Sequence, residues 1–330
     1  MADPLSHEVL TGLVRKLEQQ PNLIGLEEVA PATDPVDSNQ FKYDEIHRNR
    51  DMAEFSDPDG EAYVVDNQGE IERNGETATI KEKKTIKGST MSWLRRPGTE
   101  NQQYGLAKLR REMSHLNDRV DKREEWMVWR AVHNSIDYVR PDDGYEFHIT
   151  FNIPDDHMVA PSTLWTDHAS SVPAVDLLEW AELIEQDSGF VADRTYMTSK
   201  VMRNLVQNQS VRELLGEGTV QEQVAQTGQI PQLSDLDLRK YDGSFEDRDG
   251  NVQKFVGEND IVMLPDPDQP NDEIIERKMA PSTDPKADFE PGRFSKSWET
   301  EDPARTNGLI ELNTVPVVKL PEAIYQTNVL

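Results

Sequence analysis

The spacing of apolar positions predicts a helix near the start of the chain. Residues 6–19 carry apolar side chains at helical spacing, Ser6 is suited to cap the first turn, and Pro21 would end the helix. The next segment, to about residue 46, mixes prolines with short apolar groups and has no period, so we expect an extended arm that lies along another surface. The apolar positions of the helix are Val9, Leu10, Leu13, Val14 and Leu17.

The strongest helical pattern begins after Gly105. Apolar residues follow in a three-four rhythm, and proline and glycine do not occur again before Pro141, which predicts one helix of about seven or eight turns. Two later helices are predicted at residues 173–186 and 196–215, the second with a capping box of Ser210 and Glu213. The apolar positions of the long helix are Leu106, Leu109, Met113, Leu116 and Val120.

The remaining patterns indicate β-structure and loops. Residues 61–73, with a turn near Asn67 to Gly69, and residues 77–86 are β-rich runs, and together they predict a long two-stranded ribbon. Residues 145–151 predict a strand, and residues 235–265 and 308–330 are β-rich. The stretch from Pro265 to Glu301 is dominated by Asp, Glu and Pro and is expected to form long loops. The order of elements is that of an α+β protein: arm, ribbon, long helix and mixed body.

The segment from Arg239 to Val256 has two interpretations. As a calcium loop of the EF-hand type, it would take its first, third, fifth and twelfth ligands from Asp247, Asp249, Asn251 and Glu258, but its glycine is misplaced for that loop. As a β-hairpin, it would reverse at Asp249-Gly250 in a type I′ turn. The position of the glycine favours the hairpin, whose apolar positions would be Tyr241, Phe245, Val252 and Phe255.

The composition describes a long and strongly acidic chain. It has 330 residues and a formal net charge of −27. Copies with so much like charge repel each other unless salt screens them, so a halophilic origin and an ordinary acidic mesophilic protein both remain open. The chain has no cysteine, which excludes disulfides and thiolate sites. The amino terminus does not resemble a signal peptide and no long apolar run occurs, so we expect a soluble protein without a membrane partner.

The search for catalytic or metal-binding patterns gives little. Histidines and aspartates gather between residues 148 and 168, but they lack the spacing of a zinc site and are expected to be solvated loop residues. No nucleophile elbow, phosphate loop or dinucleotide fingerprint is present, so we expect neither an enzyme nor a cofactor. The residues of this group are His148, Asp155, Asp156, His157, Asp167 and His168.

Residues 165–215 resemble tailed-virus major capsid proteins of the lambda E type. That family has, in order, a Trp-led segment, a helix that opens near Pro-x-x-Asp, a glycine, and a Met-containing helix with an Asn-x-x-Val ending. Residues 240–251 and 255–265 are similar to its strand pair and following Leu-Pro strand, with Phe245 where tyrosine is usual, and residues 22–45 are similar to its amino-terminal arm. The matching residues in the first segment are Trp165, Pro173, Asp176, Gly189, Met202, Asn208 and Val211.

The resemblance implies the HK97-like fold and its domains. The expected parts are a helix and arm (1–46), an extended β-ribbon loop or E-loop (47–98), a P-domain with a spine helix (99–165), an A-domain with part of the P-domain (166–300), and carboxy-terminal β-segments that return to the P-domain (301–330). Arm and ribbon are expected to gain much of their order on assembly.

The implied function is that of a shell protein. Copies would assemble in the host cytoplasm into hexamers and pentamers of an icosahedral virion capsid, enclosing double-stranded DNA without sequence recognition. The resemblance also implies portal, scaffold and cementing proteins as partners. Two alternatives remain: a shell of the same fold that encloses protein cargo, and an acidic enzyme or calcium-binding module.

The long helix also carries a basic stripe opposite its apolar one. We weigh three interpretations: a solvated face, attraction to packaged DNA, and a seam with carboxylates of the same chain or a neighbour. We favour the seam, because so acidic a chain supplies carboxylates at contact range. Its residues are Lys108, Arg111, His115, Arg119, Lys122, Trp126 and Trp129.

Overall fold

The computed structural model describes residues 6–17, 22–47, 69–86, 100–142, 144–216, 230, 232–233, 236–265, 274–287, 289–300 and 305–330. The chain divides into two units, each built from three separate segments. Unit 1 comprises Met1–Phe41, Asn74–Val128 and Glu276–Pro316, and unit 2 comprises Lys42–Arg73, Trp129–Ile275 and Val317–Leu330. Of the helices described, none is long and apolar enough to cross a membrane.

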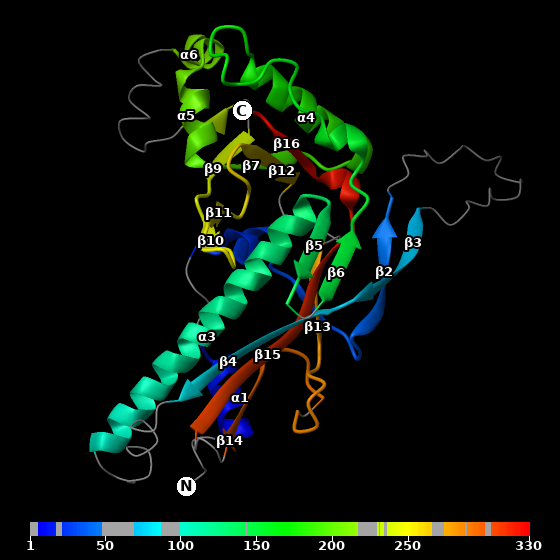
Figure 1. Ribbon diagram of the computed structural model, residues 1–330. Helices are drawn as coiled ribbons and strands as arrows, with labels where there is room; N and C mark the ends of the chain where they lie inside the picture. The colour runs from blue at the N-terminus through cyan, green and yellow to red at the C-terminus, as the bar shows by residue number, and fades with distance from the viewer. Residues whose placement is uncertain are drawn as a thin grey trace, which may run out of the picture. The chain divides into compact units, whose positions relative to one another are not determined.

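Unit 1 combines the long helix with a mixed sheet (Figure 1). The strand order is β1-β13-β15-β14, and β4 pairs with the other edge of β15. Strand β1 is parallel to β13, whereas β14 and β4 are antiparallel to β15. The elements are α1 (His7–Arg15), η1 (Gly25–Val29), β1 (Thr33–Pro35), β4 (Ala78–Ile86), α3 (Glu100–Val132), β13 (Ile275–Ala280), β14 (Phe294–Thr300) and β15 (Arg305–Val318), with the last turn of α3 in unit 2.

The core of unit 1 forms where α1 and α3 meet the sheet. The hydroxyl of Ser6 accepts a hydrogen bond from the amide of Val9, so the predicted N-cap is confirmed. Buried residues of α1 and α3 share one cluster with β15, as the three-four rhythm predicts. Thr11 fixes α1 on β14, because its hydroxyl bonds to both the amide and the carbonyl of Ser295 at 3.0 Å. The buried cluster comprises Leu10, Val14, Leu109, Met113, Leu116, Val120, Ile310 and Leu312.

The ends of α3 differ from the prediction. The helix begins at Glu100, before Gly105, and ends at Val132. Asn134 adopts a left-handed conformation (φ 74°), which reverses the chain into strand β5 (Ser135–Arg140). The sequence analysis did not anticipate this strand, because no proline or glycine marks the break.

Buried charges tie α3 to distant segments of unit 1. Asp121 and Glu124 are fully buried, and Arg293 forms ion pairs with both, at 2.7 Å to Glu124. Arg277, on β13, pairs with Glu124 at 3.4 Å and donates to the carbonyl of Ala30 at 2.8 Å. Because an unpaired buried charge is far more costly than a paired one, these arginines hold β13, the loop before β14 and the arm to one helix.

Glu125 binds the arm directly. Its carboxylate is fully buried and accepts hydrogen bonds from the amides of Gly25 and Leu26, at 2.8 and 2.9 Å. These amides open the π-helical turn η1, where backbone donors lack partners within the turn. In the described residues, therefore, the arm is anchored to its own chain.

Two predictions for unit 1 are wrong. The stretch from Pro265 to Glu301 was expected to form loops, but it contains strands β13 and β14. The charges that suggested solvated loops are paired: Lys278 binds Asp34 and Glu276 at 2.5 and 3.1 Å. Within the described residues, the two β-rich runs of the expected ribbon do not pair with each other: β3 (Glu70–Glu76) pairs with β2 (Gln40–Ile46), and β4 pairs with β15. The turn expected at Asn67 lies outside the described residues.

Unit 2 is a five-stranded sheet with helices packed on it (Figure 1). Its order is β16-β12-β7-β9-β8, with only β7 and β9 parallel. The last strand, β16, joins this sheet and not that of β15. The main elements are α4 (Pro173–Ser188), β7 (Ala192–Met197), α5 (Ser199–Gln207), α6 (Gln209–Leu215), β8 (Gln232–Leu233), β9 (Leu236–Lys240), β12 (Asp260–Pro265) and β16 (Tyr325–Asn328).

The smaller elements of unit 2 include two antiparallel hairpins. The strand predicted at residues 145–151 is β6 (Tyr145–Thr150), which pairs with β5. The second hairpin joins β10 (Ser244–Glu246) to β11 (Val252–Lys254). Short 3-10 turns lie at η2 (Asp155–Met158) and η3 (Pro321–Ala323).

The second predicted helix of this region is two helices. Residues 196 and 197 belong to β7, and the chain breaks between α5 and α6 at Asn208. The side chain of Asn208 accepts from the amides of Ser210 and Val211, so the cap is Asn208 and not Ser210.

We predict that Glu125→Gln destabilises unit 1. Glutamine keeps the shape but replaces one acceptor oxygen with an NH2 donor, so one of the two hydrogen bonds from the Gly25 and Leu26 amides is lost, at a cost of about 1–3 kcal/mol in unfolding free energy. Denaturant unfolding combined with hydrogen exchange over residues 22–30 measures this loss.

Glu112→Gln is the matched control on the same helix. Glu112 pairs with Lys84 near the surface, and such a pair contributes about 0–1 kcal/mol. Equal stability of the two variants would contradict the assigned role of Glu125.

Candidate functional site

The basic stripe of α3 lies at the surface of unit 1. Arg111, His115, Arg119 and Lys122 are exposed, and Lys108 is half-buried. The opposite face of the helix is buried against α1 and β15. A solvent-facing row of cations on an acidic chain is suited to bind carboxylates.

Part of the stripe already has a partner on strand β4. Arg119 donates two hydrogen bonds to Glu82, at 3.0 and 3.2 Å. Lys84 of the same strand pairs with Glu112 of α3. Arg111 and Lys122 make no ion pair within the described part of the chain, so their charges remain available at the surface.

The two tryptophans assigned to the stripe differ in their exposure to solvent. Trp126 is half-buried, with the guanidinium of Arg123 at 4.9 Å from its ring centre. Trp129 is fully buried in unit 2, where it stacks on Tyr241 at 5.4 Å and meets Tyr196 edge-on at 5.5 Å. The expectation that Trp129 anchors a surface junction is therefore wrong. The helical projection assumed one solvent-facing side, but the last turns of α3 are enclosed.

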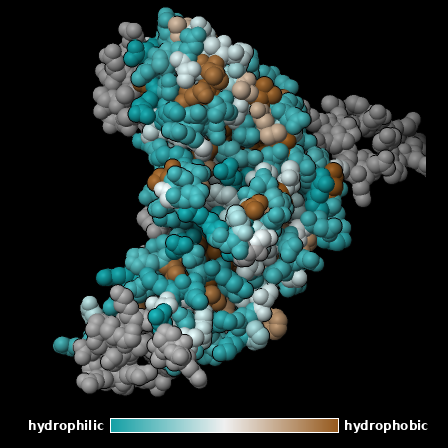
Figure 2. Space-filling view, in the orientation of Figure 1, coloured by the Kyte–Doolittle hydropathy of each residue, from teal (hydrophilic) through white to brown (hydrophobic). Residues whose placement is uncertain are grey.

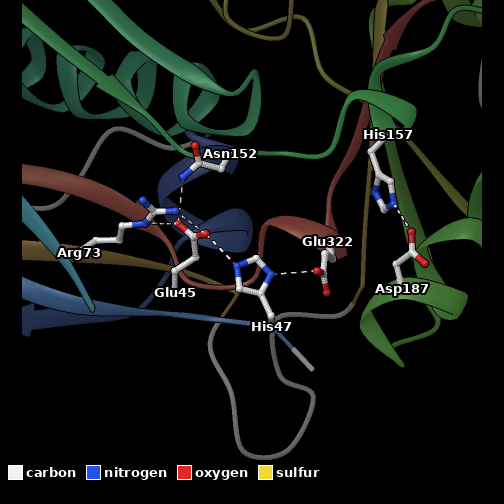
Figure 3. Close-up of polar contacts among 7 residues, drawn as sticks. All are labelled: Glu45, His47, Arg73, Asn152, His157, Asp187 and Glu322. Carbon is white, nitrogen blue, oxygen red and sulfur yellow. Dashed lines mark hydrogen bonds and ion pairs between the residues drawn. The ribbon is translucent and has the colours of Figure 1, made fainter. Parts of the chain in front are cut away.

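A polar cluster lies near the end of the β2–β3 pair where β2 ends and β3 begins (Figure 3). Glu45 of β2 is buried, and its carboxylate accepts from Arg73 of β3 at 3.0 and 3.2 Å and from Asn152 at 3.1 Å. His47 lies between Glu45 and Glu322 of η3, with 2.9 Å from each ring nitrogen to a carboxylate oxygen. Burial opposes ionisation of Glu45, but the donors around it, Arg73 first, hold its pKa below the usual range.

This cluster was not predicted from the sequence. Its members come from distant parts of the chain: His47 and Glu322, which are in contact, are 275 residues apart. The available signal was local: Glu45 and His47 are two positions apart at the end of a predicted extended segment, so their side chains point to the same side. Nothing in the sequence indicated which distant residues would meet them.

The segment with the disputed calcium loop is a hairpin. Its register joins Ser244 to Lys254 and Glu246 to Val252. The turn differs in type from the prediction: the amide of Gly250 bonds to the carbonyl of Asp247 at 3.2 Å, and only Gly250 is left-handed (φ 84°). This is a type I turn followed by a glycine bulge, with Arg248 and Asp249 at its centre.

The carboxylate of Asp247 is occupied by the hairpin itself. It accepts from the amides of Asn251 and Asp249, at 2.8 and 3.0 Å, and from the side chain of Gln253 at 2.9 Å. These hydrogen bonds, from Asn251 above all, lower the pKa of Asp247. Phe245 and Tyr241 both pack on Phe255, so apolar contacts close the other side.

The histidines of residues 148–168 have three separate environments. His148 binds Asp137 across the β5–β6 hairpin, and His168 binds Asn204. His157 is fully buried, with Nδ1 at 2.9 Å from the carbonyl of Ile324 and Nε2 at 3.1 Å from Asp187 (Figure 3). The expectation of a solvated residue is wrong for His157, which joins η2 to the carboxy-terminal segment and α4.

The residues that carry the family resemblance are structural in unit 2. The indole of Trp165 donates to Asp176 at 2.8 Å, and burial raises the pKa of that carboxyl. Gly189 ends α4 with a left-handed φ of 74°. Asn208 caps α6 and also donates to the hydroxyl of Ser171 at 2.7 Å. Trp165, Asp176, Gly189 and Asn208 therefore end, begin or hold together elements of unit 2.

Comparison with known proteins gives a consistent result. The model of the family described as phage major capsid protein E matches residues 6–329. A protein assigned as a prophage capsid protein of E. coli CFT073 is similar over 99% of both chains, with 18% identity and a TM-score of 0.68. A chain of the satellite phage P4 procapsid structure, which includes a size-determination protein, matches with 11% identity over 100% of this chain and 92% of its own, with a TM-score of 0.53. Among curated proteins, none matches the sequence.

A third similar structure is the capsid of cyanophage P-SCSP1u. It has 9% identity over 95% of this chain and 89% of its own, with a TM-score of 0.52. These likenesses define the fold as the HK97-like fold of phage capsid subunits, as expected from the sequence. The chain belongs to the phage major capsid protein E family. It is therefore a structural protein of the virion capsid and not an enzyme.

We predict that the β10–β11 hairpin needs no calcium. Addition of a chelator should leave hydrogen exchange of residues 244–254 unchanged, whereas Asp247→Ala should speed it, because backbone amides lose their acceptor.

Asp249→Ala separates the two interpretations. A calcium loop requires that carboxylate, whereas the hairpin uses only the amide of Asp249. Calcium-dependent protection that this variant abolishes would contradict the hairpin account.

Proposed function

We propose that the chain is the shell-building subunit of a tailed double-stranded DNA virus, and that its copies form hexamers and pentamers that close an icosahedral shell around the genome. The observation that carries this proposal is the match of the family model to residues 6–329. Closed shells are built from repeated copies of a few interfaces, so one chain suffices for the surface. The enclosed DNA is held without sequence recognition.

The parts of the fold receive their roles within this proposal. Residues 1–46 form the arm, 47–98 the E-loop, 99–165 the P-domain with α3 as its spine helix, and 166–300 the A-domain with part of the P-domain. Within 301–330, we assign β15 to the P-domain and β16 to the A-domain, because β16 pairs with β12.

Accessory partners are also part of the proposal. The P4 procapsid contains a size-determination protein. By analogy, we propose that portal, scaffold and cementing proteins act with this shell.

We propose that the stripe of Lys108, Arg111, His115, Arg119 and Lys122, with Trp126 beside it, forms a seam with carboxylates. Arg119 and Glu82 supply an example of the contact within one chain. For Arg111 and Lys122, carboxylates of a neighbouring copy are the expected partners, because the chain has 62 acidic residues against 35 basic ones. The visible face of the molecule is also mainly hydrophilic (Figure 2), as suits contacts of this kind.

We predict that reversing Arg111 and Lys122 to Glu impairs assembly while circular dichroism stays unchanged. Both side chains are exposed, so the fold does not depend on them, but reversal places like charges at the seam. Assembly is measured by electron microscopy and light scattering over a salt series, because screening shortens from about 10 Å at 0.1 M to about 3 Å at 1 M.

Arg110→Glu is the control for this experiment. Arg110 is exposed on α3 but lies outside the stripe. If the double variant forms particles as readily as the control at every salt concentration, the seam is refuted and the stripe is a solvated face.

A further inference from the structure

His47 faces two hydrogen-bond acceptors at once (Figure 3). Its Nε2 lies 2.9 Å from Oε1 of Glu45, and its Nδ1 lies 2.9 Å from Oε1 of Glu322. An ionised carboxylate can only accept, so each contact requires an N–H on the ring. A neutral imidazole has one N–H, whereas an imidazolium has two. Only the charged ring satisfies both contacts.

The surrounding charges balance the charged ring. Arg73 of β3 and His47 provide two cations, and Glu45 and Glu322 provide two anions. Tyr43 is the remaining titratable group near them on β2, and its pKa is raised, first by burial and then by Glu45. Loss of the proton from His47 would leave the cluster with one excess negative charge.

The two carboxylates would respond differently to that loss. Glu45 is 1% exposed and keeps its bonds from Arg73 and Asn152. Glu322 is 21% exposed, and His47 is its hydrogen-bond partner within the described residues. A neutral ring therefore keeps its proton on Nε2, toward the buried carboxylate, and turns a lone pair toward Glu322.

The residue also lies where two segments meet. The amide of Ile46 donates to the carbonyl of Lys319 at 2.7 Å, and the amide of His47 donates to the carbonyl of Gly69 at 2.6 Å. His47 thus lies at the end of β2, between the start of β3 and the segment that leads to η3.

We propose that His47 is a pH-dependent clasp, which as an imidazolium ties the end of β2 to the carboxy-terminal turn η3 and as a neutral ring releases Glu322. The contact belongs to unit 2 of a single subunit, so it goes beyond the shell-building role and does not depend on it.

The direction of the pH dependence follows from the local contacts. Burial opposes the charged form of His47, but hydrogen bonds to Glu322 and Glu45 outweigh it and raise its pKa. A raised pKa means that the clasp contributes fully below the ordinary histidine value of about 6.5, and that this contribution is lost as pH rises through the value in the folded protein. The lowered pKa of Glu45 keeps that carboxylate ionised as pH falls.

Hydrogen exchange of the full chain tests the clasp. Exchange is measured at about pH 6 and about pH 8.5 and corrected for the intrinsic pH dependence of amide exchange. We expect peptides that cover residues 40–47 and 317–325 to exchange several-fold faster at the higher pH. His148→Gln is the control and should keep this behaviour, because His148 binds Asp137 on another hairpin.

Two variants should remove the pH dependence. In His47→Gln the side-chain amide has the same NH2 donor group and the same carbonyl acceptor at every pH. In Glu322→Gln the amide of residue 322 can donate to Nδ1 of the neutral ring, so the contact survives at high pH; this position is partly exposed and its substitution should not disturb folding. Exchange that is independent of pH in the wild type, or equally pH-dependent in Glu322→Gln, would overturn the proposal.

Discussion

The fold of unit 1 depends on the partners of three buried carboxylates on one helix. Asp121, Glu124 and Glu125 lie about one turn apart at most in α3, and each is at most 1% exposed. Removing such charges from water costs several kcal/mol each unless hydrogen bonds and opposite charges replace the water. The replacements come from segments that are distant in the sequence: Arg277, Arg293 and the first amides of η1. The contacts that offset the cost of burying these carboxylates therefore also position the arm and the sheet.

These contacts bear on how the amino-terminal arm becomes ordered. The apolar residues of the arm follow no regular period, which made order through assembly the natural expectation. The structure instead gives the arm two anchors within its own chain, the amides held by Glu125 and the parallel pairing of β1 with β13. A subunit organised in this way meets its neighbours with its arm already placed, so assembly costs less ordering entropy. Surface cations such as Arg111 are then free to serve contacts with other copies.

Local patterns predicted local structure well. The rhythm of Leu109, Met113 and Leu116 fixed the buried face of α3, and Gly250 indicated the hairpin. Predictions failed where a distant partner decided the outcome. Glu276 and Lys278 suggested a loop, yet they neutralise each other within a strand, and Trp129 followed the basic stripe in projection but is enclosed by Tyr196 and Tyr241. The cluster around His47 could not be predicted because its carboxylates come from opposite ends of the chain. The family resemblance succeeded because its motif residues, such as Trp165 and Asn208, hold elements together locally.

The central claim is that the carboxylates of α3 hold the arm before any neighbour is present. Hydrogen exchange of residues 22–36, compared between unassembled subunits and assembled particles, tests it most directly. The account predicts that the amides of Gly25 and Leu26 and the β1 pairing are already protected in the unassembled subunit, with little further gain in the particle. Rapid exchange in the free subunit, with protection only after assembly, would contradict it and would show that neighbouring copies order the arm.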